Sequence, residues 1–255
     1  MKISVITCVL NGEKYINDCL SSIACQQFRN FELIVIDGYS TDNSIKIIKK
    51  YSSSLPIRLF QQKPAGISAA MNYGSRKAQG DFLIHLHADD LFHDKNVLRD
   101  VNLFLEKNEK LDWIYGKINS IEEEGKPIGI FPTKKLFQIN FYHLLKYINY
   151  IPHQSVFIRK NVFEKYGYFD ENLSSEMDTE FWLRIGKKTR WKFFDRIISN
   201  YRIHSSAQSS GVKNRETTRK NREFVQKRYT NLFEFTLCKL INRLIWKIYD
   251  RKNLR

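Results

Sequence analysis

Short apolar runs alternate with amphipathic stretches along the first 90 residues. The runs are rich in β-branched residues, as buried strands are, and they cover 3–10, 31–36, 57–60 and 81–87. In the stretches between them, apolar residues recur at the spacing of one helix face. Strands that alternate with helices of this length indicate βαβ units. We therefore predict an α/β domain with a mostly parallel central sheet flanked by helices.

The pattern beyond residue 90 is less regular. It predicts helices over 97–105, 136–150 and 177–187, and extended segments over 113–121, 128–131, 154–159 and 191–204. In the last part, apolar positions follow one helical face and basic residues recur four apart on another, which is typical of a basic amphipathic helix. We therefore expect a domain over 1–210 and a helical tail over 211–255.

Basic residues are concentrated in that tail. The chain carries 42 Lys and Arg against 27 Asp and Glu, and residues 213–255 hold 13 of the basic but only 4 of the acidic side chains. A net charge of +9 in so short a segment indicates a polyanionic partner, either lipid head groups or nucleic acid. The basic part of the tail has few interleaved aromatic residues and no recognised nucleic-acid-binding module, so the sequence favours lipid.

The amino-acid composition excludes some classes of protein. Hydrophobic residues make up 42% of the chain, which excludes a largely disordered protein, and no apolar run approaches the ~18–20 residues that span a membrane. The N-terminus enters a strand pattern directly, so we expect no secretory signal. The four cysteines lack the spacing of a disulfide framework, which favours the cytosol.

Polar residues follow three of the predicted strands where each strand ends. They are Asn11, Asp37 and the pair Asp89 and Asp90. Ligands of parallel sheets bind beyond the carboxyl ends of the strands, so these side chains are candidates for one site. An Asp pair suits Mg²⁺ or Mn²⁺ with phosphate oxygens, and His87 or His204 would add a nitrogen ligand. The alternatives are a helix N-cap for the Asp pair and a plain turn for Asp37.

Two later segments also contain polar residues that suit a site. Asp178 and Glu180 lie near the start of a predicted helix, where the helix dipole alone would favour acidic residues. His153 and Gln154 stand at the start of a predicted strand, where one of them would line a pocket or His153 would be a satisfied structural histidine. Each segment leaves both alternatives open when it is taken by itself.

Five segments occur in the order of a known set of motifs. They are Ile3 to Gly12, Phe31 to Ser44, Pro64 to Gly74, Gln79 to Asp90, and Met177 to Arg184. Together they resemble glycosyltransferase family 2, the inverting enzymes of the GT-A fold, and its members that build bacterial capsule, exopolysaccharide and lipopolysaccharide. The resemblance runs from Ile3 to about Ser210. The chain departs from the family pattern at Leu10, Tyr39, Met71, His87 and Met177.

The resemblance implies a single Rossmann-like domain that binds a nucleotide-sugar, with a nucleotide-binding half over 1–90 and an acceptor-binding half over 91–210. The donor-binding residues that it implies are Thr7, Asn11, Asp37, Gly66, Asn72 and His87. The metal ligands for Mg²⁺ or Mn²⁺ would be Asp89 and Asp90, joined by His204. Asp178 would be the general base.

The implied reaction is inverting transfer of a sugar from a nucleoside-diphosphate sugar, with a UDP-sugar favoured. The acceptor would be a glycan or a polyprenyl-diphosphate-linked glycan in cell-surface polysaccharide biosynthesis. The enzyme would act in the cytoplasm at the inner face of the cytoplasmic membrane, where residues 213–255 would bind anionic lipid. Packing of the tail on the domain, or a homodimer contact, is the alternative. The segment Tyr201 to Ser206, which leads into the polar stretch 205–211, is a candidate lid.

Two other classes of protein compete with this interpretation. A nucleotidyltransferase acting on sugar phosphates would share the α/β sheet and the acidic site, but it favours a glycine-rich loop with a basic residue near the first strand. This chain has Asn11, Gly12 and Glu13 there. A non-enzymatic nucleic-acid-binding protein would explain the net charge of +15.

Overall fold

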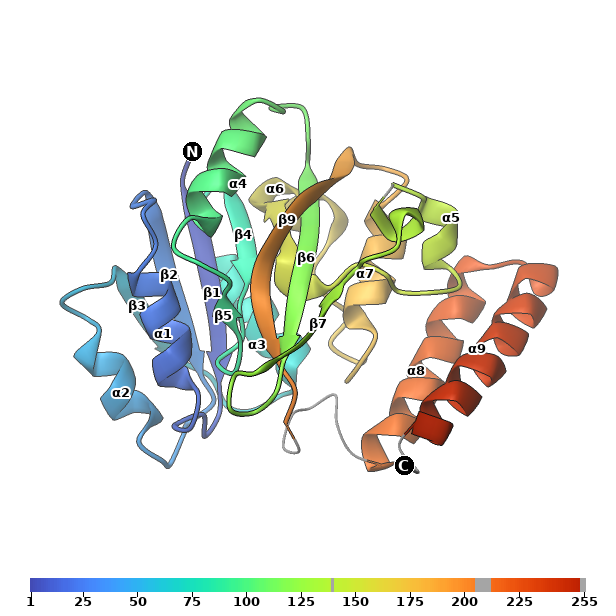
Figure 1. The fold of residues 1–255 in the computed structure, drawn as a ribbon, viewed down its shortest axis with the longest axis horizontal. Coiled ribbons are helices and arrows are strands. Elements are labelled where there is room, and N and C mark those ends of the chain that lie inside the picture. The colour runs from blue at the N-terminus through green and yellow to red at the C-terminus, as the bar shows by residue number, and fades with distance from the viewer. Residues whose placement is uncertain (139, 205–211, 253–255) are drawn as a thin grey trace.

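The computed structural model of the chain describes residues 1–138, 140–204 and 212–252, and it confirms the α/β class (Figure 1). In these ranges nine strands form one sheet in the order β3-β2-β1-β4-β8-β6-β9-β5, and β7 pairs with β6 outside this path. The strands are β1 (Ile3–Val9), β2 (Phe31–Asp37), β3 (Ile57–Gln61), β4 (Phe82–His85), β5 (Leu91–Phe92), β6 (Trp113–Ile121), β7 (Pro127–Phe131), β8 (Val156–Arg159) and β9 (Trp191–Arg202). The helices are α1 (Ile16–Ala24), α2 (Ser44–Lys50), α3 (Ile67–Lys77), α4 (Val97–Glu106), α5 (Tyr142–Leu145), α6 (Lys160–Tyr166), α7 (Met177–Ile185), α8 (Val212–Tyr229) and α9 (Leu232–Lys252).

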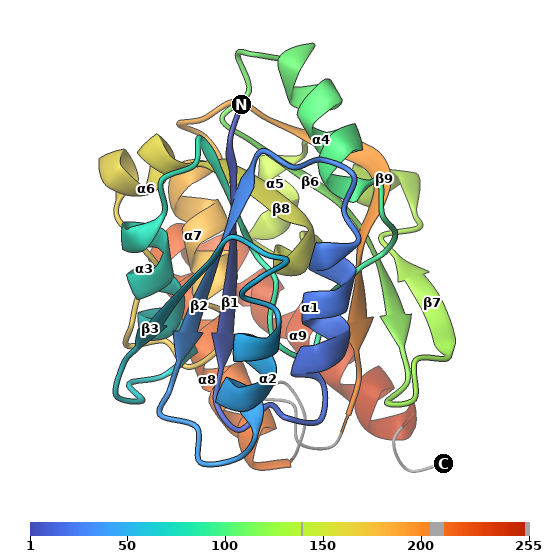
Figure 2. The ribbon, with the colours of Figure 1, turned by 90° about the vertical axis from the view of Figure 1, so that its left-hand side faces the viewer.

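The strands of the first half are parallel neighbours in the order β3-β2-β1-β4. Successive residues of a strand point to opposite faces of the sheet. In β1, Ile3 and Val5 accordingly pack in one hydrophobic cluster, and Ile6 and Cys8 pack in the other. Helices α1 and α4 cover the first face, and α3, α6 and α7 cover the second (Figure 2). Because both faces are buried, these strands are the nearly continuous apolar runs that the sequence contains.

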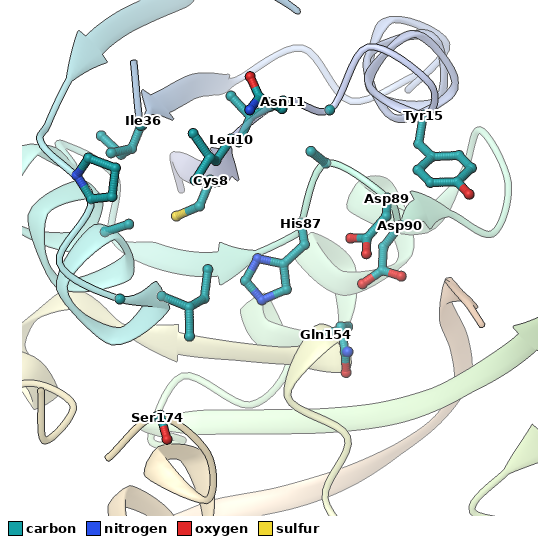
Figure 3. A pocket seen from close by; sticks show the side chains of 18 of the residues that line it. Cys8, Leu10, Asn11, Tyr15, Ile36, His87, Asp89, Asp90, Gln154 and Ser174 are labelled. Carbon is teal, nitrogen blue, oxygen red and sulfur yellow. The ribbon is translucent and has the colours of Figure 1, made fainter. Parts of the chain in front are cut away.

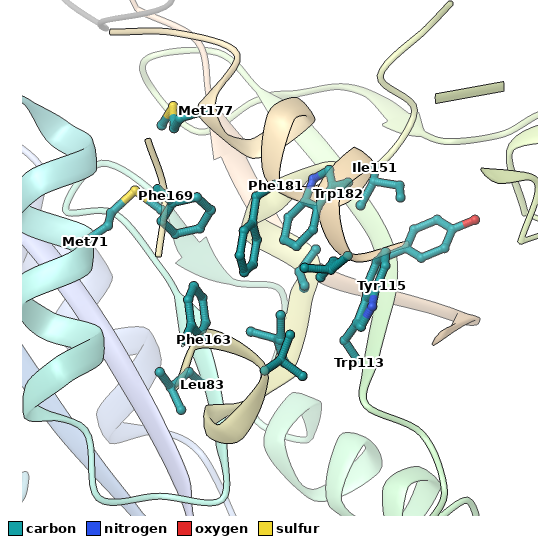
Figure 4. Close-up of a cluster of buried hydrophobic side chains, with 14 of the residues drawn as sticks. Met71, Leu83, Trp113, Tyr115, Ile151, Phe163, Phe169, Met177, Phe181 and Trp182 are labelled. Atoms are coloured by element: carbon teal, nitrogen blue, oxygen red, sulfur yellow. The ribbon is translucent and has the colours of Figure 1, made fainter. Parts of the chain in front are cut away.

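The second half of the sheet is mixed and carries an aromatic core. β8 lies antiparallel to β4 and to β6, whereas β6 and β9 are parallel. Trp113 of β6 stacks on Trp182 of α7 and Trp191 of β9, with ring centroids 5.1 and 4.6 Å apart. Figure 4 shows Trp182 beside Phe181, which belongs to the same cluster. Stacked aromatic pairs of this kind fix relative orientation as well as burying area, so α7 is held rigidly against the sheet.

The single helix expected over 136–150 is wrong. Only Tyr142–Leu145 is α-helical, and a short 3-10 turn covers Lys135–Gln138. Phe137 stacks on Tyr150 at 5.7 Å, and Tyr150 packs against Tyr115 of β6 at 6.0 Å. The Phe137 backbone oxygen accepts a hydrogen bond from the Tyr115 hydroxyl. The apolar spacing of this segment therefore reflects a loop folded onto the sheet, with several separate contacts in place of one helix face.

The tail forms a hairpin of two helices where one was expected. Asn231 and Glu234 start α9 with reciprocal bonds: the Glu234 N–H donates to Asn231 Oδ1 at 2.9 Å, and the Asn231 N–H donates to Glu234 Oε2 at 3.1 Å. This is the pattern of a capping box, with Asn in the N-cap position. Figure 1 shows the hairpin beside α5 and α7. Of the described helices, none combines the length and apolarity needed to cross a bilayer.

Candidate functional site

A cavity of about 1290 Å³ lies where the parallel strands end. The loops that follow β1, β2, β3 and β4 form one side of its wall, and the start of α7 forms another. This is the edge at which open parallel sheets bind ligands, and the volume suits a ligand larger than most small drugs. The hairpin also contributes to the wall, through Thr218 of α8.

The loops after β1 and β2 are tied together by Asn11. Its Oδ1 accepts a hydrogen bond from the Thr41 N–H at 2.8 Å, and its own N–H donates to Ser40 Oγ at 2.9 Å. Asn11 has a φ of 52°, in the left-handed region that Asn tolerates better than most residues. Asn11 therefore fixes the shape of this wall of the cavity, and Gly66 stands on the wall after β3.

Asp89 and Asp90 occupy one corner of the cavity but differ in surroundings. The Asp89 carboxylate is partly exposed, and its Oδ2 lies 3.0 Å from His204 Nε2. Asp90 is buried, and its Oδ1 accepts a bond from the Arg202 N–H at 3.0 Å. Burial, together with the neighbouring Asp89, raises the pKa of Asp90 well above its usual range. Figure 3 shows both carboxylates on one side of His87.

The donor set of this corner fits a hard divalent cation that shares its ligands with phosphate. Asp90 Oδ2 is a buried oxygen for which the structure gives no hydrogen-bond partner, and Asp89 stands beside it. Within the described ranges, no three His, Cys, Asp or Glu side chains converge as a complete metal site. Mg²⁺ and Mn²⁺ suit such a partial site, because one or two carboxylates, water and substrate phosphates complete their shells.

Arg202 supports the same corner and was missed by the sequence analysis. This buried residue donates from Nε to the Asp89 backbone oxygen at 3.2 Å and from Nη2 to Asp18 Oδ2 at 2.9 Å. It also bonds the backbone oxygen of Glu123 at 2.5 Å. The guanidinium thus joins α1, β9 and the loop after β6, and it places a positive charge behind the Asp pair.

Asp178 reaches the cavity from the first turn of α7. Its Oδ2 accepts a hydrogen bond from Asn149 Nδ2 at 3.0 Å, and its Oδ1 accepts one from the Thr179 N–H at 2.8 Å. Burial and the nearby Glu176 raise the pKa of Asp178 to about 6. A carboxylate with a pKa near neutrality is suited to general base chemistry.

His87 lies on the cavity wall against His153, with ring centroids 4.8 Å apart. Burial lowers the pKa of both imidazoles, so both are neutral at physiological pH. His87 Nδ1 and His153 Nε2 are buried atoms for which the structure gives no hydrogen-bond partner. The pair therefore gives this side of the wall a neutral, polar surface next to the acidic corner.

Three of the residues expected at the donor are not on the cavity wall. Thr7 and Asp37 are fully buried in β1 and β2, and the Asp37 carboxylate accepts bonds from the Ser40 N–H and from Gln61. Asn72 is buried in α3, where it bonds the backbone N–H and oxygen of Phe169. Neighbouring elements satisfy the polar groups of Asp37 and Asn72, which brace the loops of the site. Thr7 Oγ1 is a buried atom for which the structure gives no hydrogen-bond partner, and a contact of these three residues with the donor stays a prediction.

The structure brings together the other expected residues: Asn11, Gly66, His87, Asp89, Asp90, Asp178 and His204. It adds cavity residues that the sequence analysis did not single out, among them Lys63, Asn149, Glu176 and Thr218. Asn149 and Thr218 come from segments without a motif, so no local sequence signal marks them. Of the candidate lid, Tyr201 and Arg202 end β9, whereas residues 205–211 lie outside the described residues.

About the first two thirds of the chain match a family model. The model described as glycosyl transferase family 2 covers residues 4–167. A PGL/p-HBAD biosynthesis glycosyltransferase of Mycobacterium bovis is 30% identical over 200 residues, which are 77% of this chain and 70% of that protein. An uncharacterized glycosyltransferase of Rickettsia felis is 28% identical over 83% of this chain. The chain spans only 36% of the length of that Rickettsia relative.

Solved structures show the same fold. Staphylococcus aureus TarS in complex with UDP-GlcNAc superposes with a TM-score of 0.73 at 23% identity, over 88% of this chain and 65% of that one. A mannosyltransferase from Pyrobaculum calidifontis, in complex with GDP-Man and Mn²⁺, gives a TM-score of 0.67 at 14% identity, over 94% of this chain and 68% of that one. At these identities the likeness concerns the fold.

Proposed function

The chain belongs to glycosyl transferase family 2, and from this premise we propose that it transfers a sugar, with inversion, from a nucleoside-diphosphate sugar to a glycan acceptor. The observation that carries the proposal is the position of Asp178: a carboxyl group with a pKa of about 6 shares one cavity with Asp89, Asp90 and His204. In this proposal residues 1–90 bind the nucleotide, and residues 91–210 bind the acceptor.

A UDP-sugar is the donor that we favour. The TarS structure that this fold resembles contains UDP-GlcNAc, whereas the more distant mannosyltransferase contains GDP-Man. Asn11 and Gly38 on the cavity wall would contact the nucleoside. Leu10, which is exposed at the same wall, would supply an apolar contact for the base.

The mechanism uses two groups of acidic residues on the cavity wall. Asp89 and Asp90, with His204 beside them, would hold Mg²⁺ or Mn²⁺, which neutralises charge on a departing diphosphate. From the first turn of α7, Asp178 accepts the proton of the acceptor hydroxyl while the hydroxyl oxygen attacks the anomeric carbon from the face opposite the diphosphate. Asn149 keeps the carboxylate oriented during this step. A single displacement of this kind inverts the anomeric centre.

A thermal-shift screen of nucleoside diphosphates, with and without Mn²⁺, tests the donor. A ligand at about 100 times its Kd stabilises the folded state by roughly 2.7 kcal/mol, so UDP with Mn²⁺ should raise Tm by about 5–10 °C. Mn²⁺ alone and uridine alone are the controls and should give much smaller shifts. Stabilisation by a nucleoside triphosphate together with a sugar phosphate, and by no diphosphate, would instead favour a nucleotidyltransferase. Salt-dependent RNA binding without any nucleotide effect would favour the nucleic-acid-binding class.

We further propose that the tail binds the anionic surface of the cytoplasmic membrane, where a polyprenyl-diphosphate-linked acceptor would be found. One side of α9 packs on the domain: Cys238 is buried, and Glu234 forms an ion pair with Lys146 at 2.7 Å.

An exposed apolar stripe remains on α9, made up of Phe233, Leu237, Leu240 and Leu244. Exposed basic residues adjoin the stripe, namely Lys239, Arg243 and Lys247. Each basic residue near an anionic surface contributes about 1 kcal/mol, so charge complementarity favours lipid over a second copy of this basic chain.

Vesicle flotation tests this surface. The full chain should float with vesicles that contain phosphatidylglycerol, less so at high salt, and not with phosphatidylcholine alone. Leu240→Ser with Leu244→Ser should weaken binding at least tenfold, since each buried leucine is worth roughly 1.5–3 kcal/mol. Leu103→Ser, at an exposed leucine of α4, is the matched control and should float like the wild type. If the wild type fails to float but dimerises through this stripe, then the partner of the stripe is a second copy of the chain and not lipid.

A further inference from the structure

Helix α8 contacts the segment that leads into α7. Arg222 of α8 lies one helical turn beyond Thr218, which is on the cavity wall. Its Nε and Nη2 lie 3.1 and 3.0 Å from Oε1 of Glu176. Both side chains are largely buried: 18% of Arg222 and 8% of Glu176 remain exposed. A charge-assisted pair in so little solvent holds its geometry much better than a pair on the surface.

Glu176 has an unusual backbone. It is the residue before the first turn of α7, two positions before Asp178, and its φ and ψ are 63° and 9°. The left-handed conformation is unfavourable for a residue with a side chain, so contacts must hold Glu176 in it. Both oxygens of its carboxylate have partners: Oε1 has Arg222, and Oε2 accepts a bond from Thr179 Oγ1 at 2.8 Å. Asn221 of α8 adds hydrogen bonds to Ser175, the residue that precedes Glu176.

We propose that Arg222 is a positioning residue for the reaction: it holds Glu176 in its left-handed conformation and so keeps the carboxylate of Asp178 at the cavity wall. This inference rests on the proposed role of Asp178 as the general base. It assigns to the tail a part in the active site that is separate from any attachment to lipid. The hairpin is thus part of the catalytic unit.

The electrostatics of this contact predict a second effect. The groups that face Asp178 are Glu176 on its own segment and the uncharged Asn149 from the loop before β8. Burial and the charge of Glu176 raise the pKa of Asp178. From α8, Arg222 neutralises Glu176. Removing Arg222 leaves the Glu176 charge uncompensated, so the pKa of Asp178 should rise further, and less of the base should be ionised at neutral pH.

Other contacts keep the hairpin docked when Arg222 is changed. The Tyr229 hydroxyl bonds Glu180 at 2.5 Å, and Lys146 pairs with Glu234 of α9. Glu180 in turn binds Arg184 of its own helix, so this network lies about one helical turn beyond Glu176 along α7. A substitution of Arg222 therefore tests the local contact with Glu176.

The experiment compares Arg222→Gln with Lys220→Gln, which removes the same charge from an exposed position of the same helix. Arg222→Gln should lower kcat about tenfold with little change in donor affinity, a loss typical of a slightly misplaced catalytic group. The acid limb of its pH profile should move to higher pH. Adding Glu176→Gln should return the limb towards or below its wild-type position, because the repelling charge is gone. Lys220→Gln should match the wild type in all respects.

A ¹³C NMR titration of Asp carboxyl groups measures the change in the pKa of Asp178 without any substrate. The Asp178 signal is assigned with the Asp178→Asn variant. The Asp178 titration should move to higher pH in Arg222→Gln and return in the double variant. An unchanged titration and unchanged kcat would overturn the proposal. So would a loss of kcat that follows a loss of Tm while the titration stays in place, since that is a purely structural role. A shifted titration in a protein that transfers no sugar would refute the proposed function and leave the contact established.

Discussion

Asp178→Asn should lower turnover by about 10²–10⁴-fold, which is the usual contribution of a general base. The amide keeps the shape of the side chain, so the cavity and donor binding should persist. The measurements are the initial rate of UDP release with acceptor present and the Tm increase caused by UDP with Mn²⁺. We expect the first to collapse and the second to remain.

The proposed role of Asp178 also predicts the direction in which the activity of the wild type changes with pH. Asp178 acts as a base only when it is ionised, and its pKa is raised to about 6. The value of kcat/KM should therefore fall as pH drops through about 6 and level off above it. Asp195→Asn is the matched control, because that carboxylate is exposed on β9, where its partner is Lys117. Equal turnover of wild type and Asp178→Asn would remove Asp178 from the mechanism.

Asp89→Asn should abolish most of the metal-dependent part of donor binding. Asp89 is the partly exposed carboxylate of the acidic corner, and a neutral amide is a poor ligand for a hard cation. Loss of even an outer partner of a metal ligand costs about 10–100-fold in affinity, and we expect at least this much here. Calorimetric titration of UDP in the presence and absence of Mn²⁺ measures the difference.

The Asn side chain can still bond His204, so the corner should keep its shape in this variant. Asp195→Asn again serves as the control and should bind UDP and Mn²⁺ like the wild type. If Asp89→Asn retains the full gain in UDP affinity from Mn²⁺, the acidic corner is not where the cation binds.

The fold of the first half was predictable because its strands are buried on both faces. Such strands are short apolar runs with helical stretches between them, and polar residues then mark the strand ends. This is why Asn11, His87 and Asp89 lie on one cavity, as expected. The pattern could not show that the Asp37 carboxylate accepts a hydrogen bond from Gln61, because Gln61 belongs to a neighbouring strand 24 residues away.

The second half depends on contacts that leave no local pattern. The apolar spacing of 136–150 predicts a helix, whereas most of the segment is a loop: Phe137 stacks on Tyr150, and its backbone oxygen accepts a hydrogen bond from Tyr115 of β6. Arg222 and Glu176 lie 46 residues apart, and each is an ordinary charged residue of a helix end or helix face. The turn between α8 and α9 is different, because the capping residues Asn231 and Glu234 can be seen in the sequence.

The contact between α8 and the start of α7 has a practical consequence for anyone who shortens this chain. The family match ends at residue 167 and the boundary expected from the sequence lies near 210, so both invite a truncation that omits the hairpin. Such a fragment would expose the surface that Val225 and Cys238 now cover and would lose the restraint on Glu176. We expect it to be a poor catalyst even in assays with no lipid present, and its inactivity would be mistaken for a missing cofactor or the wrong substrate.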